Sequence, residues 1–279
     1  MTTPRLVALD LDGTIVDERL TISPQTLGAL QHLITRSDIR VVIATGRMHP
    51  SATRFARQVG VTTPIITYQG AMVKEALPDS EPIFHQPIPL PLAQELVDYL
   101  LDEHLSVNIY MDDVLWTNPN NAYYMEYAKT AGIEPHLTDD LRGKLTVAPT
   151  KILIIDDTRV NTLRDDIRDR FGDQLGSCRS RYNFCEVNHP DVSKWAGLTF
   201  LMKDWGIAPA EVIAIGDQGN DISMLSGAGI GVAMGNAPED VKAVADFITR
   251  PIEEDGVVHA LRHFGLLDDW LDNRAGVTP

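Results

Sequence analysis

The sequence predicts an α/β fold in which an inserted α+β domain interrupts a doubly wound parallel sheet. Short, continuous apolar runs occur at residues 6–9, 39–44 and 212–215, and such runs are typical of parallel strands that are buried on both faces. Helical segments alternate with these strands, which indicates a Rossmann-like core. Between about residues 83 and 187 the alternation loosens, and this change marks the insertion.

The first elements form a βαβ unit. A strand at residues 6–9 leads to a helix from about 23 to 35, in which Ser23 is the N-cap and Pro24 the first residue. The strand at 39–44 follows.

The alternation continues with a helix at about 50–59 and a strand at 64–68. We expect this strand to extend the same sheet, and Gly70 then permits a turn with a positive φ angle.

The insertion is read as an α+β domain that mixes helices with alternating strands. Its predicted helices are about 92–104, 122–131 and 161–171, and its predicted strands are 107–110, 114–117, 151–155 and 184–187. The core pattern returns with a helix at about 195–205, the strand at 212–215, and helices near 221–226 and 239–245. The domain organisation is therefore 1–82 for the first part of the core, 83–188 for the inserted cap and 189–279 for the second part of the core. Residues 273–279 are expected to form a loose tail.

Composition limits the classes of partner. The 279 residues carry a formal net charge of -15, whereas nucleic-acid binders present a basic face, so we expect no nucleic-acid partner.

No apolar stretch reaches the roughly 18 to 20 residues of a membrane span, and no basic region followed by a long apolar segment precedes the first strand. We therefore expect a cytoplasmic protein without a membrane span. The negative charge would repel a phosphate ester unless cations or a metal ion supplied local positive charge.

Two carboxylates follow the first strand, at Asp10 and Asp12, and Gly13 permits a tight turn beside them. One carboxylate can attack phosphorus as a nucleophile while the other supplies a proton to the leaving alcohol. We assign attack to Asp10 and acid/base work to Asp12. The alternative is a solvated turn that happens to hold two acidic residues.

Thr45 and Gly46 follow the second strand, where a hydroxyl and backbone amides can donate hydrogen bonds to a phosphoryl oxygen. Alternatively, Thr45 caps the next helix. Arg47 is a weaker candidate, since a surface ion pair explains it equally well.

Asp217 and Asp221 flank a glycine-containing turn after the strand at 212–215. Carboxylates in this placement suit a hard cation, and Mg²⁺ is the natural one beside a phosphate. Asn220 is a further candidate for phosphate contact. The alternative is that Asn220 or Asp221 caps a helix, and this role is compatible with the first.

Lys194 precedes an amphipathic helix. Most lysines in such a place are solvated, but a compact cation is needed to offset the charge of phosphate and nucleophile, so we include Lys194 in the site.

His85, His136 and His189 lack the spacing of a metal centre or histidine phosphatase, and surface or hinge roles are favoured. Cys178 and Cys185 show no zinc spacing and are expected to be reduced, partly buried thiols.

These four segments, in this order, resemble the haloacid dehalogenase superfamily of phosphohydrolases, and the position of the insertion resembles its Cof-type subclass IIB of sugar-phosphatase-like enzymes. The matching motifs are Asp10-Leu11-Asp12-Gly13-Thr14, Thr45, Lys194, and Gly216-Asp217 with Asn220-Asp221, and the later Gly235-Asn236-Ala237 and Glu254-Asp255-Gly256-Val257 also agree. One departure is Gln69-Gly70-Ala71, where the subclass commonly has Asn in the first position.

The resemblance implies an Mg²⁺ ion held by the Asp10 carboxylate, the Asp12 backbone carbonyl and Asp217, with Asp221 as a further ligand or support. It also implies an aspartyl-phosphate intermediate on Asp10. The insertion would be a cap that excludes water and contacts the leaving group. Candidates for that contact are Asn108, Tyr110, Arg181 and Tyr182.

The leading hypothesis is a magnesium-dependent phosphomonoesterase that hydrolyses a small phosphorylated metabolite, with a sugar phosphate favoured. The alternatives are a phosphotransferase or phosphomutase of the same chemistry, and a non-catalytic sensor of a phosphorylated metabolite. The sequence defines neither the metabolite nor the oligomeric state.

Overall fold

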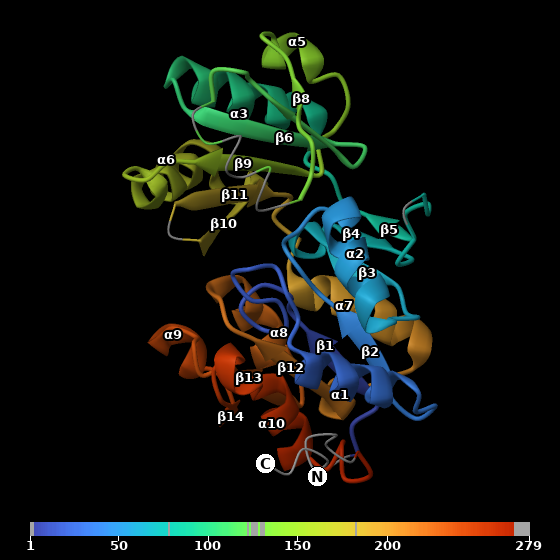
Figure 1. Cartoon of the computed structure of the whole chain (residues 1–279). Coiled ribbons are helices and arrows are strands. Elements are labelled where there is room, and N and C mark those ends of the chain that lie inside the picture. The colour runs from blue at the N-terminus through green and yellow to red at the C-terminus, as the bar shows by residue number, and fades with distance from the viewer. Residues whose placement is uncertain are drawn as a thin grey trace. The chain divides into compact units, whose positions relative to one another are not determined.

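The computed structural model of the protein describes residues 3–77, 79–121, 123, 128, 132–181 and 183–270 (Figure 1). The chain divides into two compact units. The first unit comprises Met1–Ala44, Ala56–Thr63 and Leu201–Pro279, and the second comprises Thr45–Phe55 and Pro64–Phe200. The boundaries 83 and 188 of the inserted domain stay a prediction.

The first unit contains a five-stranded sheet in the order β14-β13-β12-β1-β2, and every neighbouring pair is parallel. Its strands are β1 (Leu6–Leu9), β2 (Arg40–Ile43), β12 (Val212–Gly216), β13 (Ile230–Ala233) and β14 (Phe247–Ile248). The three central strands consist almost wholly of buried aliphatic residues, as a parallel sheet covered on both faces requires. The predicted fold class is confirmed.

The strand order reverses beside β1. The chain passes from β1 to β2 on one side, and β12 lies against the other side of β1, with Leu9 opposite Ile215. In open α/β sheets, ligands bind at the carboxyl ends of the strands where the order reverses. Residues that follow β1 and β12 are therefore brought to this position.

The helices that carry residues of the first unit are α1 (Pro24–Ile34), α2 (His49–Val59), α7 (Lys194–Trp205), α8 (Ile222–Gly227), α9 (Glu239–Lys242) and α10 (Gly256–His263). Ser23 caps α1 as predicted, because its hydroxyl accepts a 3.0 Å hydrogen bond from the amide of Thr26. The α1 helix contacts β2 and α10, whereas α8 contacts β12 and β13. The elements β13, β14 and α10 were not predicted.

The second unit begins with a small antiparallel sheet, β3 (Ile65–Thr67), β4 (Met72–Lys74) and β5 (Phe84–His85). The expectation that the strand at 64–68 extends the parallel sheet is therefore wrong. Tyr68, Gln69 and Gly70 all adopt positive φ angles, of 52°, 64° and 109°. This turn reverses the chain, so that β4 pairs antiparallel with β3.

The insertion contributes a six-stranded sheet in the order β10-β11-β9-β6-β7-β8. Its strands are β6 (Ser106–Met111), β7 (Val114–Thr117), β8 (His136–Leu137), β9 (Lys151–Ile155), β10 (Gly176–Arg181) and β11 (Phe184–Asn188), and its helices are α3 (Leu90–Asp102), the short α5 (Leu141–Lys144) and α6 (Val160–Phe171). The α3 and α6 helices cover one face of the sheet and share an apolar core with it (Figure 1). Most of the predicted helix at 122–131, and the tail at 273–279, lie outside the described residues.

The opposite face of this sheet packs against the small sheet of the same unit. Tyr110, Leu115 and Leu153 share a buried cluster with Tyr68 and Met72. The rings of Tyr68 and Tyr110 meet edge to face, with centroids 5.8 Å apart. Tyr68, Ala71 and Met72 thus join the insertion in one hydrophobic core.

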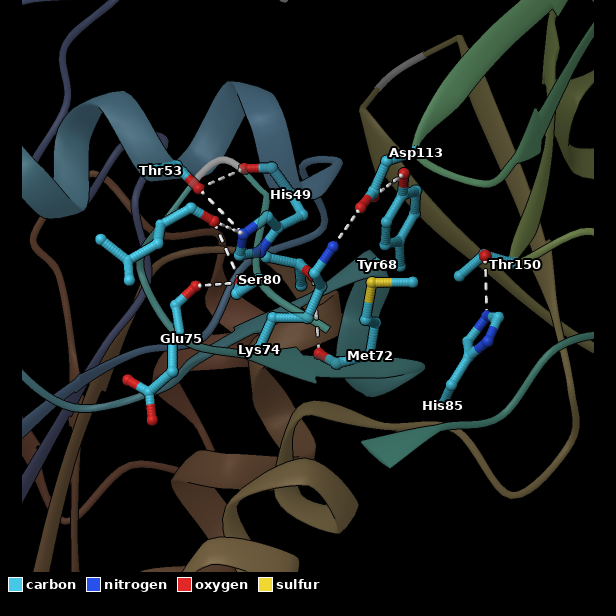
Figure 2. A network of polar contacts seen from close by, with 12 residues as sticks. His49, Thr53, Tyr68, Met72, Lys74, Glu75, Ser80, His85, Asp113 and Thr150 are labelled. Atoms are coloured by element: carbon cyan, nitrogen blue, oxygen red, sulfur yellow. Dashed lines mark hydrogen bonds and ion pairs between the residues drawn. The ribbon is translucent and has the colours of Figure 1, made fainter. Parts of the chain in front are cut away.

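Polar contacts support this packing (Figure 2). Figure 2 shows Lys74 and Tyr68 converging on Asp113, at the tip of the β6–β7 hairpin; the ammonium lies 2.8 Å and the phenol oxygen 2.9 Å from its carboxylate. The fully buried His49 lies on α2, where its Nε2 contacts the hydroxyl of Thr53. The same Nε2 lies 3.1 Å from the carbonyl oxygen of Leu77.

No helix in the described part of the chain combines the length and apolar character needed to cross a membrane. Cys178 and Cys185 are free thiols, the second of them buried, as predicted. Burial raises the pKa of Cys185 to about 12.

Burial also lowers the pKa of His49 below its ordinary value. The folded state therefore binds this proton less readily than the unfolded state, and stability is lost as the pH falls through the ordinary histidine pKa of about 6.5. We expect the free energy of unfolding, measured by urea denaturation, to fall between about pH 7.5 and pH 5, and to fall less in His49→Gln. The exposed His104 supplies the control, since His104→Asn should keep the wild-type decrease. Equal decreases in His49→Gln and the wild type would contradict the assignment.

Candidate active site

The site begins where β1 ends. Asp10 follows Leu9 directly, and its amide donates a 3.0 Å hydrogen bond to the carbonyl of Ile215 in β12. This bond continues the parallel pairing of β1 and β12 by one residue. Asp10 is therefore held on the sheet, with only 5% of its surface exposed.

The loop after Asp10 turns tightly at Gly13. Gly13 has a φ of +81°, and its amide donates to the carbonyl of Val16 at 2.9 Å. A Cβ atom at this position would lie 2.2 Å from Oδ2 of Asp217. Glycine is required both for the backbone conformation and for the close approach of the carboxylate. Asp12, half-buried, lies in this loop.

The loop after β12 is organised by Asp221. Its Oδ2 accepts hydrogen bonds from the amides of Asp217 and Gln218, each at 2.9 Å. Asp221 ends the 3₁₀ turn Gly219–Asp221, and Asn220 lies half-buried within the same turn. The Asp221 side chain makes no capping bond to α8, so the alternative that Asp221 caps this helix is not borne out. The two bonds instead orient the backbone that carries Asp217.

Three carboxylates meet here. Asp10, Asp217 and Asp221 can each present an oxygen atom such that the three atoms lie within 4.8 Å of one another, and all three residues are buried. Within the described residues this is the one such group of histidine, cysteine or acidic side chains. Like charges this close are unfavourable in a buried site unless a cation or protons offset them. A set of hard oxygen donors fits a hard divalent cation such as Mg²⁺.

Neutral donors surround the Asp217 carboxylate. Its Oδ1 accepts from the hydroxyl of Thr14 at 3.3 Å, and its Oδ2 accepts from the side-chain amides of Gln218 at 3.0 Å and Asn236 at 3.3 Å. Asn236 also donates to the carbonyl of Gly13 at 2.9 Å. Asn236 thereby links both acidic loops.

Thr14, Gln218 and Asn236 were not predicted to take part in the site. The motif matches at positions 10–14, 216–221 and 235–237 were the available signal for them.

Thr45 and Gly46 belong to the second unit. The Thr45 side chain, 1% exposed, accepts a 3.1 Å hydrogen bond from the amide of Arg47. Helix α2 begins only at His49, so Thr45 caps this local turn and not the helix. Arg47 donates to the hydroxyl of Ser51 at 3.0 Å.

Lys194 also belongs to the second unit and begins α7. It is 0% exposed, so the alternative that it is merely solvated is wrong. Lysine is almost never fully buried unless it is paired. Ser193 caps the helix beside it, with its hydroxyl 3.1 Å from the amide of Ala196.

The candidates for contact with the leaving group lie on the insertion. Asn108 and Tyr110 are both fully buried in β6, and Asn108 accepts a 3.2 Å hydrogen bond from the side chain of Asn121. Both would have to become accessible in order to touch a ligand. Arg181 ends β10, and Tyr182 lies outside the described residues.

The comparisons with known proteins identify the family of the chain. Residues 7–261 match the haloacid dehalogenase-like hydrolase family. The sequence is 32% identical over 278 residues to the 5-amino-6-(5-phospho-D-ribitylamino)uracil phosphatase YitU of Bacillus subtilis, and the match covers 94% of this chain and 98% of that protein.

Two solved structures are similar as well. A haloacid dehalogenase-like hydrolase from Bacteroides thetaiotaomicron superposes with a TM-score of 0.84 at 30% identity, covering 94% of this chain and 99% of the other. A sugar phosphatase of haloacid dehalogenase subclass IIB superposes with a TM-score of 0.81 at 25% identity, with coverage of 94% and 99%. The chain belongs to the haloacid dehalogenase-like hydrolases and is an enzyme of that family, as its motifs predict.

If the three carboxylates hold a divalent cation, Mg²⁺ will stabilise the folded chain by mass action. We expect millimolar MgCl₂ to raise the melting temperature of the wild type by several degrees, since about 1 kcal/mol corresponds to roughly 2–4 °C for a chain of this size. Asp217→Asn should lose most of this shift.

Asp204→Asn, at an exposed position of α7, is the matched control in the same melting experiment and should keep the shift. An unchanged Mg²⁺ shift in Asp217→Asn would show that the cation binds elsewhere.

Proposed function

We propose that the chain is a magnesium-dependent phosphomonoesterase that hydrolyses a small phosphorylated metabolite, of the sugar phosphate class. The buried carboxylates of Asp10, Asp217 and Asp221, at the point where the strand order reverses, are the observation that carries this proposal. The names of relatives support it: one is a phosphatase of a phospho-ribitylamino compound and another is a sugar phosphatase.

In the first step the Asp10 carboxylate attacks the phosphorus atom of the substrate. The bond from phosphorus to the ester oxygen breaks, and Asp12 gives its proton to the departing alkoxide. The products are an alcohol and an acyl phosphate on Asp10. Asp12, now a carboxylate, is ready to act as a base.

In the second step water attacks the phosphorus of the acyl phosphate while Asp12 removes a proton from it. The bond from phosphorus to the Asp10 oxygen breaks, inorganic phosphate leaves, and both aspartates return to their starting states. This step distinguishes a phosphatase from a phosphotransferase, in which an acceptor hydroxyl takes the place of water.

Mg²⁺ would be held by the Asp10 carboxylate, the Asp12 backbone carbonyl and the Asp217 carboxylate. When bound, it neutralises charge on the phosphoryl group and keeps Asp10 ionised beside an anionic substrate. The Asp221 carboxylate, which already accepts two amide hydrogen bonds, orients Asp217 and supports the negative potential that attracts the cation.

We assign phosphoryl binding to the Thr45 hydroxyl, the Gly46 amide, the Asn220 amide and the Lys194 ammonium. Hydroxyl and amide donors match the equatorial oxygens of a phosphoryl group, and lysine supplies a compact positive charge. The burial of Lys194 supports its role, since such a charge is retained in an interior only where it is compensated.

The test of the reaction is release of inorganic phosphate from a panel of phosphorylated metabolites in the presence of Mg²⁺. We expect turnover that is abolished by EDTA and reduced at least about 10³-fold in kcat by Asp10→Asn, because the nucleophile is lost. Turnover without metal that survives Asp10→Asn would refute the mechanism.

Two outcomes of this panel favour the alternatives. Phosphate found mainly on an acceptor hydroxyl would indicate a transferase or mutase. A ligand that raises the melting temperature without any phosphate transfer would indicate a sensor.

The role of Lys194 is tested separately. We expect Lys194→Met to lower kcat/KM by about 100-fold or more, because loss of a positive charge in a desolvated site weakens stabilisation of the transition state. Lys203→Met, at an exposed position of the same helix, should behave like the wild type. If circular dichroism shows both variants folded and their kcat/KM values are equal, Lys194 has no part in the reaction.

A further inference from the structure

The Thr45–Gly46 turn is fixed by the small sheet of the second unit. The amide of Thr45 donates to the carbonyl of Ile66 at 2.9 Å, and the carbonyl of Thr45 accepts from the amide of Gln69 at 3.0 Å. Tyr68 and Gln69 both adopt left-handed backbone conformations, which are costly for residues other than glycine. Such strain persists where the surrounding structure holds it in place, and it occurs preferentially at functional sites.

The side chain of Gln69 extends the attachment to the insertion. It packs directly on Gly46, where a Cβ atom would lie 2.3 Å from Nε2 of Gln69. The same Nε2 donates to Oε2 of Glu186, on β11, at 3.1 Å. An asparagine, which the subclass commonly has here, is one methylene shorter and would not span this distance from the same backbone.

A buried ion pair completes the arrangement. Nζ of Lys151, on β9, lies 3.1 Å from the same Oε2 of Glu186, and the two residues are only 1% and 4% exposed. The Lys151 ammonium also donates to the carbonyl oxygen of Gly46 at 2.9 Å. A buried ion pair is weak evidence for stability by itself, because desolvation offsets the attraction. Stability alone therefore does not explain why the Lys151–Glu186 pair is buried against the Thr45–Gly46 turn.

The peptide group between Gly46 and Arg47 transmits this contact to Thr45. The group is planar, so its carbonyl and its N–H point in opposite directions and turn together. Lys151 holds the carbonyl on one side, and on the other side the Arg47 amide donates to Oγ1 of Thr45 at 3.1 Å. Because the oxygen accepts this bond, the hydroxyl hydrogen of Thr45 is directed elsewhere.

We propose that Lys151, Glu186 and Gln69 are positioning residues for phosphoryl recognition: they orient the peptide group after Gly46 and, through it, the Thr45 hydroxyl. This inference rests on the proposed function, in which Thr45 binds the phosphoryl group. It gives two strands of the insertion a role in the reaction centre besides that of contacting the leaving group.

A double-mutant cycle tests this coupling. Lys151→Met is combined with Thr45→Val, which removes the hydroxyl at nearly constant shape, and kcat/KM for phosphate release is measured for all four proteins. We expect Lys151→Met to reduce kcat/KM about tenfold or more in the wild type and at most about twofold in the Thr45→Val background, since residues that act as one unit have non-additive effects. Glu186→Gln and Gln69→Asn should show the same dependence on Thr45. Equal losses in both backgrounds, or no loss in the wild type, would overturn the proposal.

Lys74→Met is the matched control. Lys74 is 7% exposed and pairs with Asp113 in the same unit, and its effect should be the same in both Thr45 backgrounds. Circular dichroism and melting temperatures verify folding, and Lys151→Met/Glu186→Gln provides a variant without an unpaired buried charge.

The cycle is repeated on the dissociation constant of orthovanadate, which requires no turnover. Failure of the proposed function appears as absence of phosphate release in the wild type, whereas failure of the positioning role appears as additive effects on vanadate binding.

Discussion

The first unit brings the buried carboxylates of Asp10, Asp217 and Asp221 close together. Three buried carboxylates repel one another, so the chain must hold them together by other means. Parallel pairing of β1 with β12 places two of them, the hydrogen bonds that Asp221 accepts from two amides fix the second loop, and glycine at position 13 leaves room for Asp217. The resulting negative potential is the physical basis for proposing a divalent cation.

The second unit meets a different demand, which is to present hydrogen-bond donors in a fixed direction. Thr45 is buried within a turn that is tied to β3, and the buried Lys151–Glu186 pair contacts the same turn. A rigid peptide plane converts the position of one ammonium group into the orientation of one hydroxyl. The insertion therefore contributes to the proposed phosphoryl site through its framework and not only through contacts with a leaving group.

The sequence predicted what continuous apolar runs and strong caps determine. The strand at 151–155 and the cap at Ser23 were found where expected, and so was the acidic group at the ends of β1 and β12. The prediction that β3 belongs to the parallel sheet was wrong. The turn that follows β3 depends on positive φ angles at Tyr68 and Gln69, and neither residue signals such a conformation in the sequence as glycine would. The burial of Lys194 and the pairing of Lys151 with Glu186 depend on contacts across the fold that no local pattern records.

In the proposed mechanism Asp10 accepts the phosphoryl group beside a cation that Asp10, Asp12 and Asp217 hold. A crystal structure of the protein grown with Mg²⁺ and beryllofluoride, an analogue of an acyl phosphate, is the decisive experiment. We expect beryllium bonded to a carboxylate oxygen of Asp10, and magnesium coordinated by Asp10, the Asp12 carbonyl and Asp217. Beryllofluoride on another side chain, or a cation bound away from these three residues, would contradict it.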